Sequence, residues 1–214
     1  MKKLLTSAAV AAALSLIGAS SADAAKYFLT VADPGAGLTG SPYGEVDVLG
    51  DGTSSLDITV MLYGTNEFHW TNDVNHHALA FDLVGNPTIT ISGLASNFSG
   101  GPTQAAGSNS ASPFGAFDYA INFPKLTGPM PVIQSFNFTV TGAPHLTLET
   151  THSSLGDTFF ATDILGAGGK TGNVGAQVPF GVPEPATWAL MIMGFGGAGA
   201  MLRRQRQKLA TATA

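Results

Sequence analysis

Hydrophobic and polar residues alternate along most of this chain, and the alternation is the first indication of its fold. Stretches such as "SLDITVMLYG", "HALAFDLVG" and "IQSFNFTVTG" place apolar side chains at every second position, which is the period of a strand with one buried face. Glycine, proline and asparagine interrupt these stretches at short intervals, as they do between strands. The pattern predicts an all-β fold over residues 25–178, a single antiparallel, jelly-roll-like β-sandwich.

The same alternation predicts which side chains face the interior of the sandwich. These are Val46, Val48, Leu56, Ile58, Val60, Leu62, Phe81, Leu83, Ile89, Ile91, Phe136, Phe138 and Val140. The stretch "SGGPTQAAGSNSASPFG", residues 99–115, has no periodicity and is predicted to be one long mobile loop. Residues 179–182 are predicted to be a linker between the domain and the C-terminal segment.

The N-terminal residues have the organisation of a secretory signal peptide. Lys2 and Lys3 precede a short apolar run, and Ala22 and Ala24 form a small-residue cleavage site of the A-x-A kind. The apolar run is too short to span a bilayer as an anchor. We therefore predict a signal peptide over residues 1–24, removed by cleavage after Ala24.

A second apolar segment, residues 186–202, lies near the C-terminus and contains no charged residue. As a helix it would be about 25 Å long, which is enough for a thin membrane. Trp188 stands at its start, where aromatic side chains favour the membrane interface. The segment ends at a basic cluster, residues 203–208, that contains Arg203, Arg204 and Arg206. These features predict a transmembrane helix with its basic end in the cytoplasm, so the preceding domain lies outside the inner membrane.

Charge excludes one broad class of partner for the domain between these segments. Residues 25–182 contain three lysines, no arginine and twelve acidic residues, which leaves a formal charge of −9. Nucleic-acid binding depends on basic side chains that contact phosphates, so we expect no nucleic-acid partner. The chain also has no cysteine, so no disulfide framework stabilises the domain.

Three ordered features follow residue 182. Pro183, Glu184 and Pro185 come first, then Trp188 and Ala189, and finally the apolar helix with its basic stop. In this order and spacing, residues 183–208 resemble the PEP-CTERM sorting signal in its PEPxxWA variant. The resemblance implies sorting by an exosortase, a membrane-embedded cysteine transpeptidase-like enzyme of Gram-negative bacteria that make exopolysaccharide. It also implies that the PEP tripeptide is the region recognised and cut, and that the protein is anchored in the membrane only until then.

Candidate chemistry within the domain is sparse. His69, Asp73, His76 and His77 could converge on a metal, although their spacing matches no metal motif. Asp51 and Asp57 lie in an acidic stretch that could bind calcium but lacks the regular array of oxygen ligands. We therefore expect no resident cofactor, with calcium as the one candidate.

Two further clusters are candidates for hydrolysis and for sugar binding. His145 and His152 lie near Ser153, Glu149 and Asp157 in the sequence, but no hydrolase motif contains these residues. The chain has many serines, so a serine near a histidine is little evidence of a catalytic site. Trp70 with Asn72, Asp73 and Asn75 is the one aromatic and amide patch that could serve as a sugar platform, and a core position for Trp70 is the simpler interpretation.

Together the signals predict an exported surface or extracellular protein that is sorted by an exosortase and is not an enzyme. A structural or adhesive role within exopolysaccharide is the leading expectation. The alternative is a calcium- or carbohydrate-binding module exported in the same way.

Overall fold

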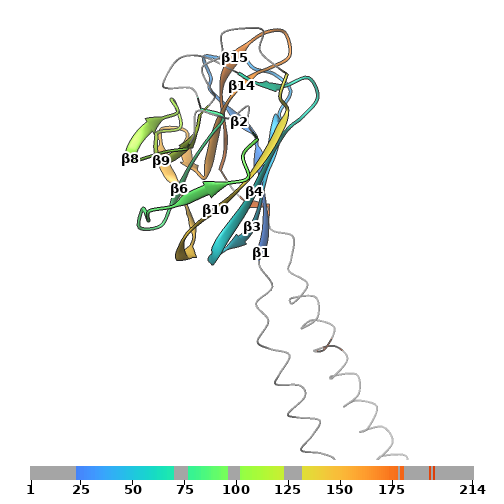
Figure 1. Ribbon diagram of the computed structural model, residues 1–214. Helices are drawn as coiled ribbons and strands as arrows, with labels where there is room; N and C mark the ends of the chain where they lie inside the picture. The colour runs from blue at the N-terminus through green and yellow to red at the C-terminus, as the bar shows by residue number, and fades with distance from the viewer. Residues whose placement is uncertain are drawn as a thin grey trace, which may run out of the picture. The chain divides into compact units, whose positions relative to one another are not determined.

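The computed structural model describes residues 23–69, 77–95, 102–122, 132–177 and 179–180, together with residues 193 and 195. The chain divides into two compact units, residues 1–180 and 181–214. The described part of the first unit is built from strands joined by turns and loops, and every strand pair in it is antiparallel (Figure 1). The predicted all-β antiparallel fold is therefore confirmed.

Two large sheets make up the first unit. The six-stranded sheet contains, in spatial order, β16 (Pro179–Phe180), β1 (Asp23–Leu29), β3 (Gly44–Asp51), β4 (Thr53–Leu62), β10 (Ser135–Leu146) and β7 (Thr90–Ser92). The eight-stranded sheet has the order β2 (Val31–Ala32), β15 (Thr171–Ala176), β14 (Phe160–Leu165), β6 (Leu79–Leu83), β9 (Ala116–Ile121) and β8 (Pro102–Ser110). Its two remaining strands are β5 (Glu67–Phe68), beside β14, and β11 (Leu148–Glu149), beside β6. A separate hairpin is formed by β12 (Thr151–Ser153) and β13 (Gly156–Thr158).

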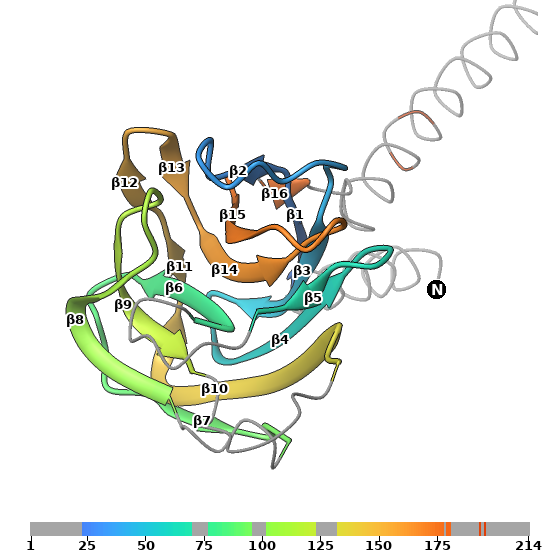
Figure 2. The same ribbon diagram turned by 90° about the horizontal axis from the view of Figure 1, so that it is seen from above.

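The two large sheets pack face to face around one hydrophobic core. Figure 2 shows them as two layers, with β4 and β10 in one and β6 and β14 in the other. Aromatic rings meet between the layers: the ring centroids of Tyr27 and Phe160 are 5.0 Å apart, and those of Phe81 and Phe138 are 6.1 Å apart. Such face-to-face packing is the arrangement of a β-sandwich; the jelly-roll likeness stays a prediction.

The predicted interior positions follow this packing closely. All of them are buried except Ile89 and Ile91, which are partly buried and pack against the core from its edge. Ile91 lies on β7, a three-residue strand at the end of the six-stranded sheet, where no further strand covers it within the described residues. Edge strands bury less of each side chain than central strands do, so alternation alone overestimates their burial.

The outer face of the eight-stranded sheet carries a second, smaller core. A row of small residues crosses four neighbouring strands in register, from Gly175 through Ala161 and Ala80 to Ala120. Phe114, from the turn between β8 and β9, packs against this row and is completely buried. The absence of large side chains along the row allows an aromatic ring to lie close to the sheet backbone.

Two segments differ from the sequence-based prediction. Residues 99–115 are not one long loop, because β8 pairs with β9 from Pro102, opposite Ile121, to Ser110, opposite Ala116. The stretch has few apolar residues, so it has no periodicity to detect, and backbone pairing at the sheet edge supplies its order instead. Pro179 and Phe180, assigned to the linker, form β16 and pair with β1.

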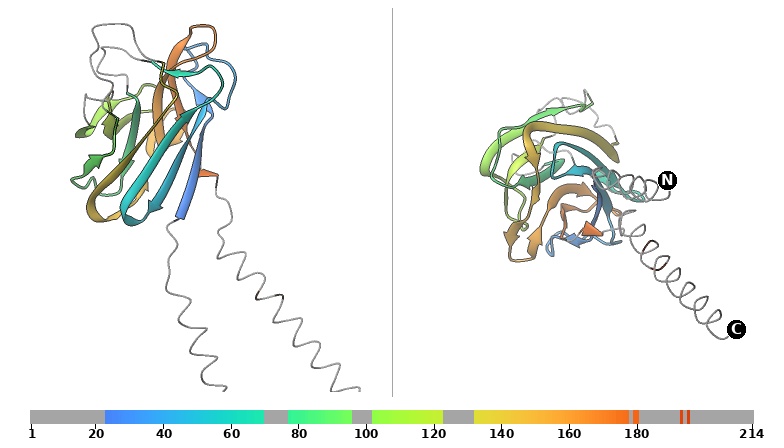
Figure 3. Two further views of the ribbon diagram at one scale, coloured as in Figure 1. Left: turned by 45° about the vertical axis from the view of Figure 1, so that its right-hand side comes forward. Right: turned by 90° about the horizontal axis from the view of Figure 1, so that it is seen from below.

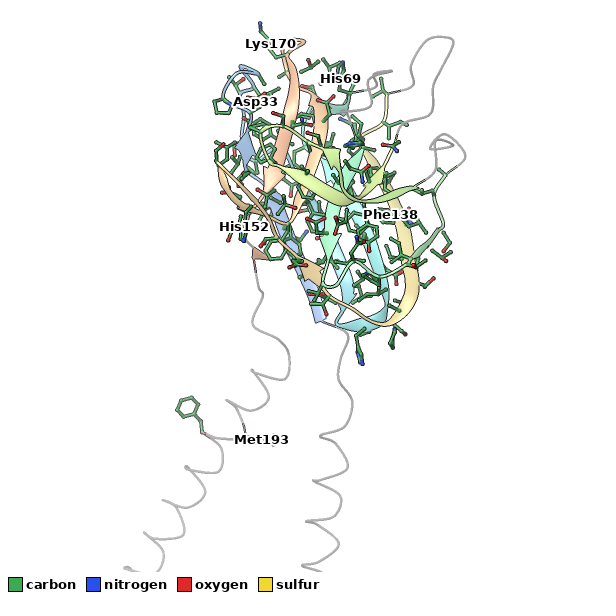
Figure 4. All side chains as sticks on the ribbon, turned by 90° about the vertical axis from the view of Figure 1, so that its left-hand side faces the viewer. Asp33, His69, Phe138, His152, Lys170 and Met193 are labelled. Atoms are coloured by element: carbon green, nitrogen blue, oxygen red, sulfur yellow. The ribbon has the colours of Figure 1, made fainter. Side chains whose placement is uncertain are left out.

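Of the second unit the structure describes Met193 and Phe195, which have helical backbone conformation and exposed side chains (Figure 4). The rest of the predicted transmembrane helix, residues 186–202, lies outside the described residues. So does the predicted signal peptide apart from Asp23 and Ala24, which begin β1. No helix in the described part of the chain is long and apolar enough to cross a membrane.

Candidate functional site

The two ends of the β-domain lie side by side at one edge of the six-stranded sheet. Figure 3 shows the short orange strand β16 beside the blue strand β1. Lys26 of β1 pairs with Phe180 of β16, and Tyr27 pairs with Pro179. Because the pairing is antiparallel, the chain enters the sheet where it also leaves it. The predicted N-terminal cut after Ala24 leaves one residue before this pair begins, and two residues separate the end of the pair from the PEP tripeptide at Pro183.

The same pairing continues into the other sheet. Val31 of β2 is five residues beyond Lys26, and its partner on β15, Gly175, is five residues before Phe180. Backbone hydrogen bonds extend the contact, from the Thr30 N–H to the Gly175 carbonyl at 3.2 Å and from the Asp33 N–H to the Asn173 carbonyl at 2.9 Å. Both ends of the β-domain therefore cross from one sheet to the other as a matched pair of segments. We call these segments, residues 26–33 on one side and residues 173–177 and 179–180 on the other, the terminal ladder.

An ionic cluster anchors the first strand of the terminal ladder. The Lys26 ammonium lies 2.7 Å from a Glu45 carboxylate oxygen and 3.0 Å from an Asp47 oxygen. The Tyr63 hydroxyl donates a hydrogen bond to the other Glu45 oxygen. Glu45 is buried, with 6% of its surface exposed, so its charge depends on these two partners.

The pKa values of the cluster follow from this geometry. Burial alone would raise the pKa of Glu45, but the hydrogen bonds from Lys26 and Tyr63 outweigh it and the pKa is lowered. The pKa of Lys26 is raised, chiefly by its hydrogen bond to Glu45. Burial, and then the hydrogen bond to Glu45, raise the pKa of Tyr63 to about 12. The lysine and the glutamate therefore stay charged together across the neutral range.

A second polar cluster lies at the end of the domain that also carries Asp33 and Lys170 (Figure 4). Asp163 of β14 is completely buried, and its carboxylate lies 2.9 Å from Nδ1 of His69. Its backbone N–H donates to the carbonyl of His77, and its carbonyl accepts from the His69 N–H, each at 3.0 Å. The imidazole Nδ1 of His77 is 2.6 Å from Oδ1 of Asn122.

This cluster contains two of the four residues considered as metal ligands. Asp163 brings His69 and His77 together through its backbone and side chain, whereas Asp73 and His76 lie outside the described residues. Trp70, Asn72 and Asn75 of the possible sugar platform lie outside them too. Across the part of the chain that the structure describes, no three histidine, aspartate or glutamate residues are grouped so that they could hold a metal ion.

The carboxylates considered for calcium have partners within the protein. Asp51 accepts a hydrogen bond from the Leu148 N–H at 2.9 Å, and Asp57 accepts one from the Thr139 hydroxyl at 2.7 Å. Each carboxylate thus fixes two strands to each other. The calcium interpretation gains no support from this pair.

The candidate residues for hydrolysis are dispersed over three structural elements: β10, the β12–β13 hairpin and, for Glu149, β11. His152 and Asp157 face each other across the β12–β13 hairpin, with 2.5 Å between imidazole Nδ1 and carboxylate oxygen, and both are exposed. The Ser153 hydroxyl donates to the Gly156 carbonyl within the same turn. His145 lies on β10, where its Nδ1 is 3.2 Å from the Gly52 carbonyl. His152, Asp157, Ser153 and His145 thus each make a contact that stabilises a turn, a hairpin or a strand end.

The structure also contains an acidic group that the sequence did not indicate. Asp82 on β6 is buried, accepts a hydrogen bond from the Asp118 N–H at 2.5 Å and another from the Thr151 hydroxyl. Glu149 lies opposite it on β11. Burial, and then the negative charges of Asp118 and Glu149, raise the pKa of Asp82 despite its two hydrogen bonds.

Most residues of the predicted sorting signal lie outside the described residues. These are Pro183, Glu184, Pro185, Trp188, Ala189, Arg203, Arg204 and Arg206. Of the predicted signal-cleavage residues, Ala22 is outside as well, and Ala24 is exposed in β1.

Comparison with known proteins identifies the C-terminal signal. The family model of the PEP-CTERM protein-sorting motif matches residues 181–206. A chain with this motif is an exported protein that an exosortase processes and that is sorted to the cell envelope or surface. The chain thus carries the PEP-CTERM sorting motif at its C-terminus, where residues 183–208 indicated it. No curated protein and no solved structure matches the chain.

Proposed function

We propose that this protein is a structural or adhesive component of the cell surface, associated with exopolysaccharide and without catalytic activity of its own. One observation carries the proposal: the PEP-CTERM motif begins at residue 181, directly after the last strand of a β-domain. Cleavage of the sorting motif releases the β-domain, which is then the part of the chain that reaches the cell surface. In this proposal it is held in the inner membrane of a Gram-negative bacterium by the helix over 186–202 until the PEP tripeptide is cut.

The outer face of the six-stranded sheet supports an association with polysaccharide. Asp57, Thr59 and Asn137 are exposed there on the central strands β4 and β10, with Asn137 directly opposite Thr59. Hydroxyl and amide groups both donate and accept hydrogen bonds, and a carboxylate accepts them. Such a face offers hydrogen-bond partners to the hydroxyl groups of a sugar chain across two neighbouring strands.

The test is cosedimentation of the processed protein with exopolysaccharide from the native host. We expect saturable binding, and weaker binding when Thr59 and Asn137 are both changed to lysine. The His152→Ala variant, on the separate β12–β13 hairpin, serves as the matched control and should bind like the wild type. Equal recovery of the protein with and without polysaccharide would contradict the proposal.

The alternative, an exported binding module for calcium or for a discrete glycan, differs in one measurable respect. A ligand that binds only the folded state raises the melting temperature by mass action. A rise with calcium or with a panel of oligosaccharides, but no cosedimentation with the polymer, would favour the alternative over the structural role.

A further inference from the structure

The terminal ladder leaves very little chain between the folded domain and the sorting motif. Phe180 is paired with Lys26, and only Gly181 and Val182 separate it from Pro183. Three residue steps span at most about 11 Å, even when fully extended. The residues that an enzyme must reach thus begin within about 11 Å of a paired strand.

An enzyme that acts on a peptide bond holds its substrate extended over several residues on each side of that bond. A peptide held in this way uses its backbone N–H and C=O groups to bind the enzyme, as an added strand does. A cleft that binds the extended chain on the N-terminal side of Pro183 beyond Val182 and Gly181 would include Phe180. The same backbone groups cannot at once pair with β1 and line an enzyme cleft.

We infer that β16 is a strap that must leave β1 before the tail is cut, so that release of β16 controls access to the PEP tripeptide. This inference rests on processing of the tail by an exosortase. The strap is short, with two paired residues, whereas the rest of the ladder is anchored by β15, which lies between β2 and β14. Detaching β16 therefore breaks few hydrogen bonds, and its cost is low because each such bond contributes little net stability. The two sheets stay packed together during this local opening.

The ionic cluster of Lys26, Glu45 and Asp47 keeps β1 in the sheet when β16 detaches. Lys26, the partner of Phe180, is held to β3 by Glu45 and Asp47. β1 also pairs with β3 along its whole length, from Asp23 to Leu29. When the strap opens, β1 consequently stays in the sheet and β16 is the strand that moves.

A reversible covalent lock tests this directly, because the chain has no cysteine of its own. Directly opposed residues in an antiparallel pair have Cα atoms about 4.5–5.5 Å apart, within the range of a disulfide. The full-length Lys26→Cys/Phe180→Cys variant would be followed in host membranes that contain the sorting enzyme, with and without dithiothreitol. The readout is the rate at which the tail is lost, measured by intact mass.

We expect the oxidised double variant to lose its tail at least about tenfold more slowly than the reduced one, because the disulfide removes local opening. The two single-cysteine variants should be cut at one rate with or without dithiothreitol. Inserting six glycine and serine residues after Phe180 should restore cutting of the oxidised double variant, because the enzyme then has free chain upstream of Pro183.

Equal rates for the oxidised and reduced double variants would overturn the strap. Failure of the insertion to restore cutting would overturn it as well, because the disulfide would then act through something other than chain length. If the wild-type chain keeps its tail under the same conditions, the processing itself is refuted. That result differs from either failure of the strap, because in both of those the wild-type chain still loses its tail.

Discussion

Gly175 allows the most direct test of how the second core is built, because its side chain is absent where an aromatic ring needs the space. A Cβ at this position would lie 2.6 Å and 2.7 Å from two ring carbons of Phe114 and 3.1 Å from a third. Phe114 is completely buried and covers the row of small residues on the eight-stranded sheet. The change to test is Gly175→Ala, which adds one methyl group.

The magnitude follows from what must move. Overpacking a well-filled core costs about 1–3 kcal/mol, and exposing a buried phenylalanine costs roughly 1.5–3 kcal/mol. Gly175→Ala should therefore lower the free energy of unfolding by about 2 kcal/mol, or the melting temperature by about 4–8 °C for a domain of this size. Gly35→Ala is the matched control, because its nearest new contact is an ordinary 3.4 Å to Asp33, and it should stay within about 0.5 kcal/mol.

Urea unfolding of the single and double variants measures the coupling. Phe114→Ala alone should cost about 3–5 kcal/mol through loss of a buried ring. In the double variant the added methyl group meets empty space, so its cost should disappear, which gives a coupling energy of about 2 kcal/mol. Additive effects of the two substitutions, or a Gly175→Ala variant as stable as the control, would refute this packing.

Three further predictions concern charged groups. Lys26→Met should lower the free energy of unfolding at pH 7 by about 1–2 kcal/mol, an amount already reduced for the partial exposure of the lysine. The fold lowers the pKa of Glu45 and raises that of Lys26. In unfolding curves across pH, the stability lost on substitution should therefore shrink below the ordinary glutamate pKa and above the ordinary lysine pKa. Asp82→Asn should leave the free energy of unfolding at pH 7 unchanged or higher, because the raised pKa of Asp82 means that its charge is unfavourable in the fold. In the wild type this cost is relieved as the pH falls through the folded pKa. A large loss of stability at pH 7 would show that the hydrogen bond from Thr151 outweighs the cost of the buried charge. His152→Ala should change the melting temperature by less than about 2 °C, because an exposed pair contributes little, and a larger drop would mean that the hairpin depends on this contact.

The strands and the main core could be predicted because their cause is local. A strand buried on one face must alternate, and positions such as Val60 and Phe138 have that alternation in the sequence itself. The strand β8 has no such signal. Its backbone pairing with β9 orders a stretch that lacks apolar residues, and nothing in the local pattern indicates this.

The candidate site was predicted less completely, because it depends on contacts between distant residues. The histidines around residues 69–77 were recognised as a polar cluster, but their partner Asp163 is far along the chain and looks like any strand residue. The same holds for Glu45, which lies within an alternating strand and gains its meaning only beside Lys26 and Tyr63. The terminal ladder likewise pairs the first strand with the last one. Local periodicity carries no information about a pairing between residues so far apart in the sequence.

The central claim is that the β-domain is exported and cut from its C-terminal sorting segment. The most direct measurement is the intact mass of the protein recovered from the surface and medium of its native host. We predict a chain that begins at Ala25 and ends within Pro183–Pro185, with any extra mass at that end marking a covalent attachment. A chain that retains every residue through Ala214 would contradict the account and would make the C-terminal segment a permanent part of the protein.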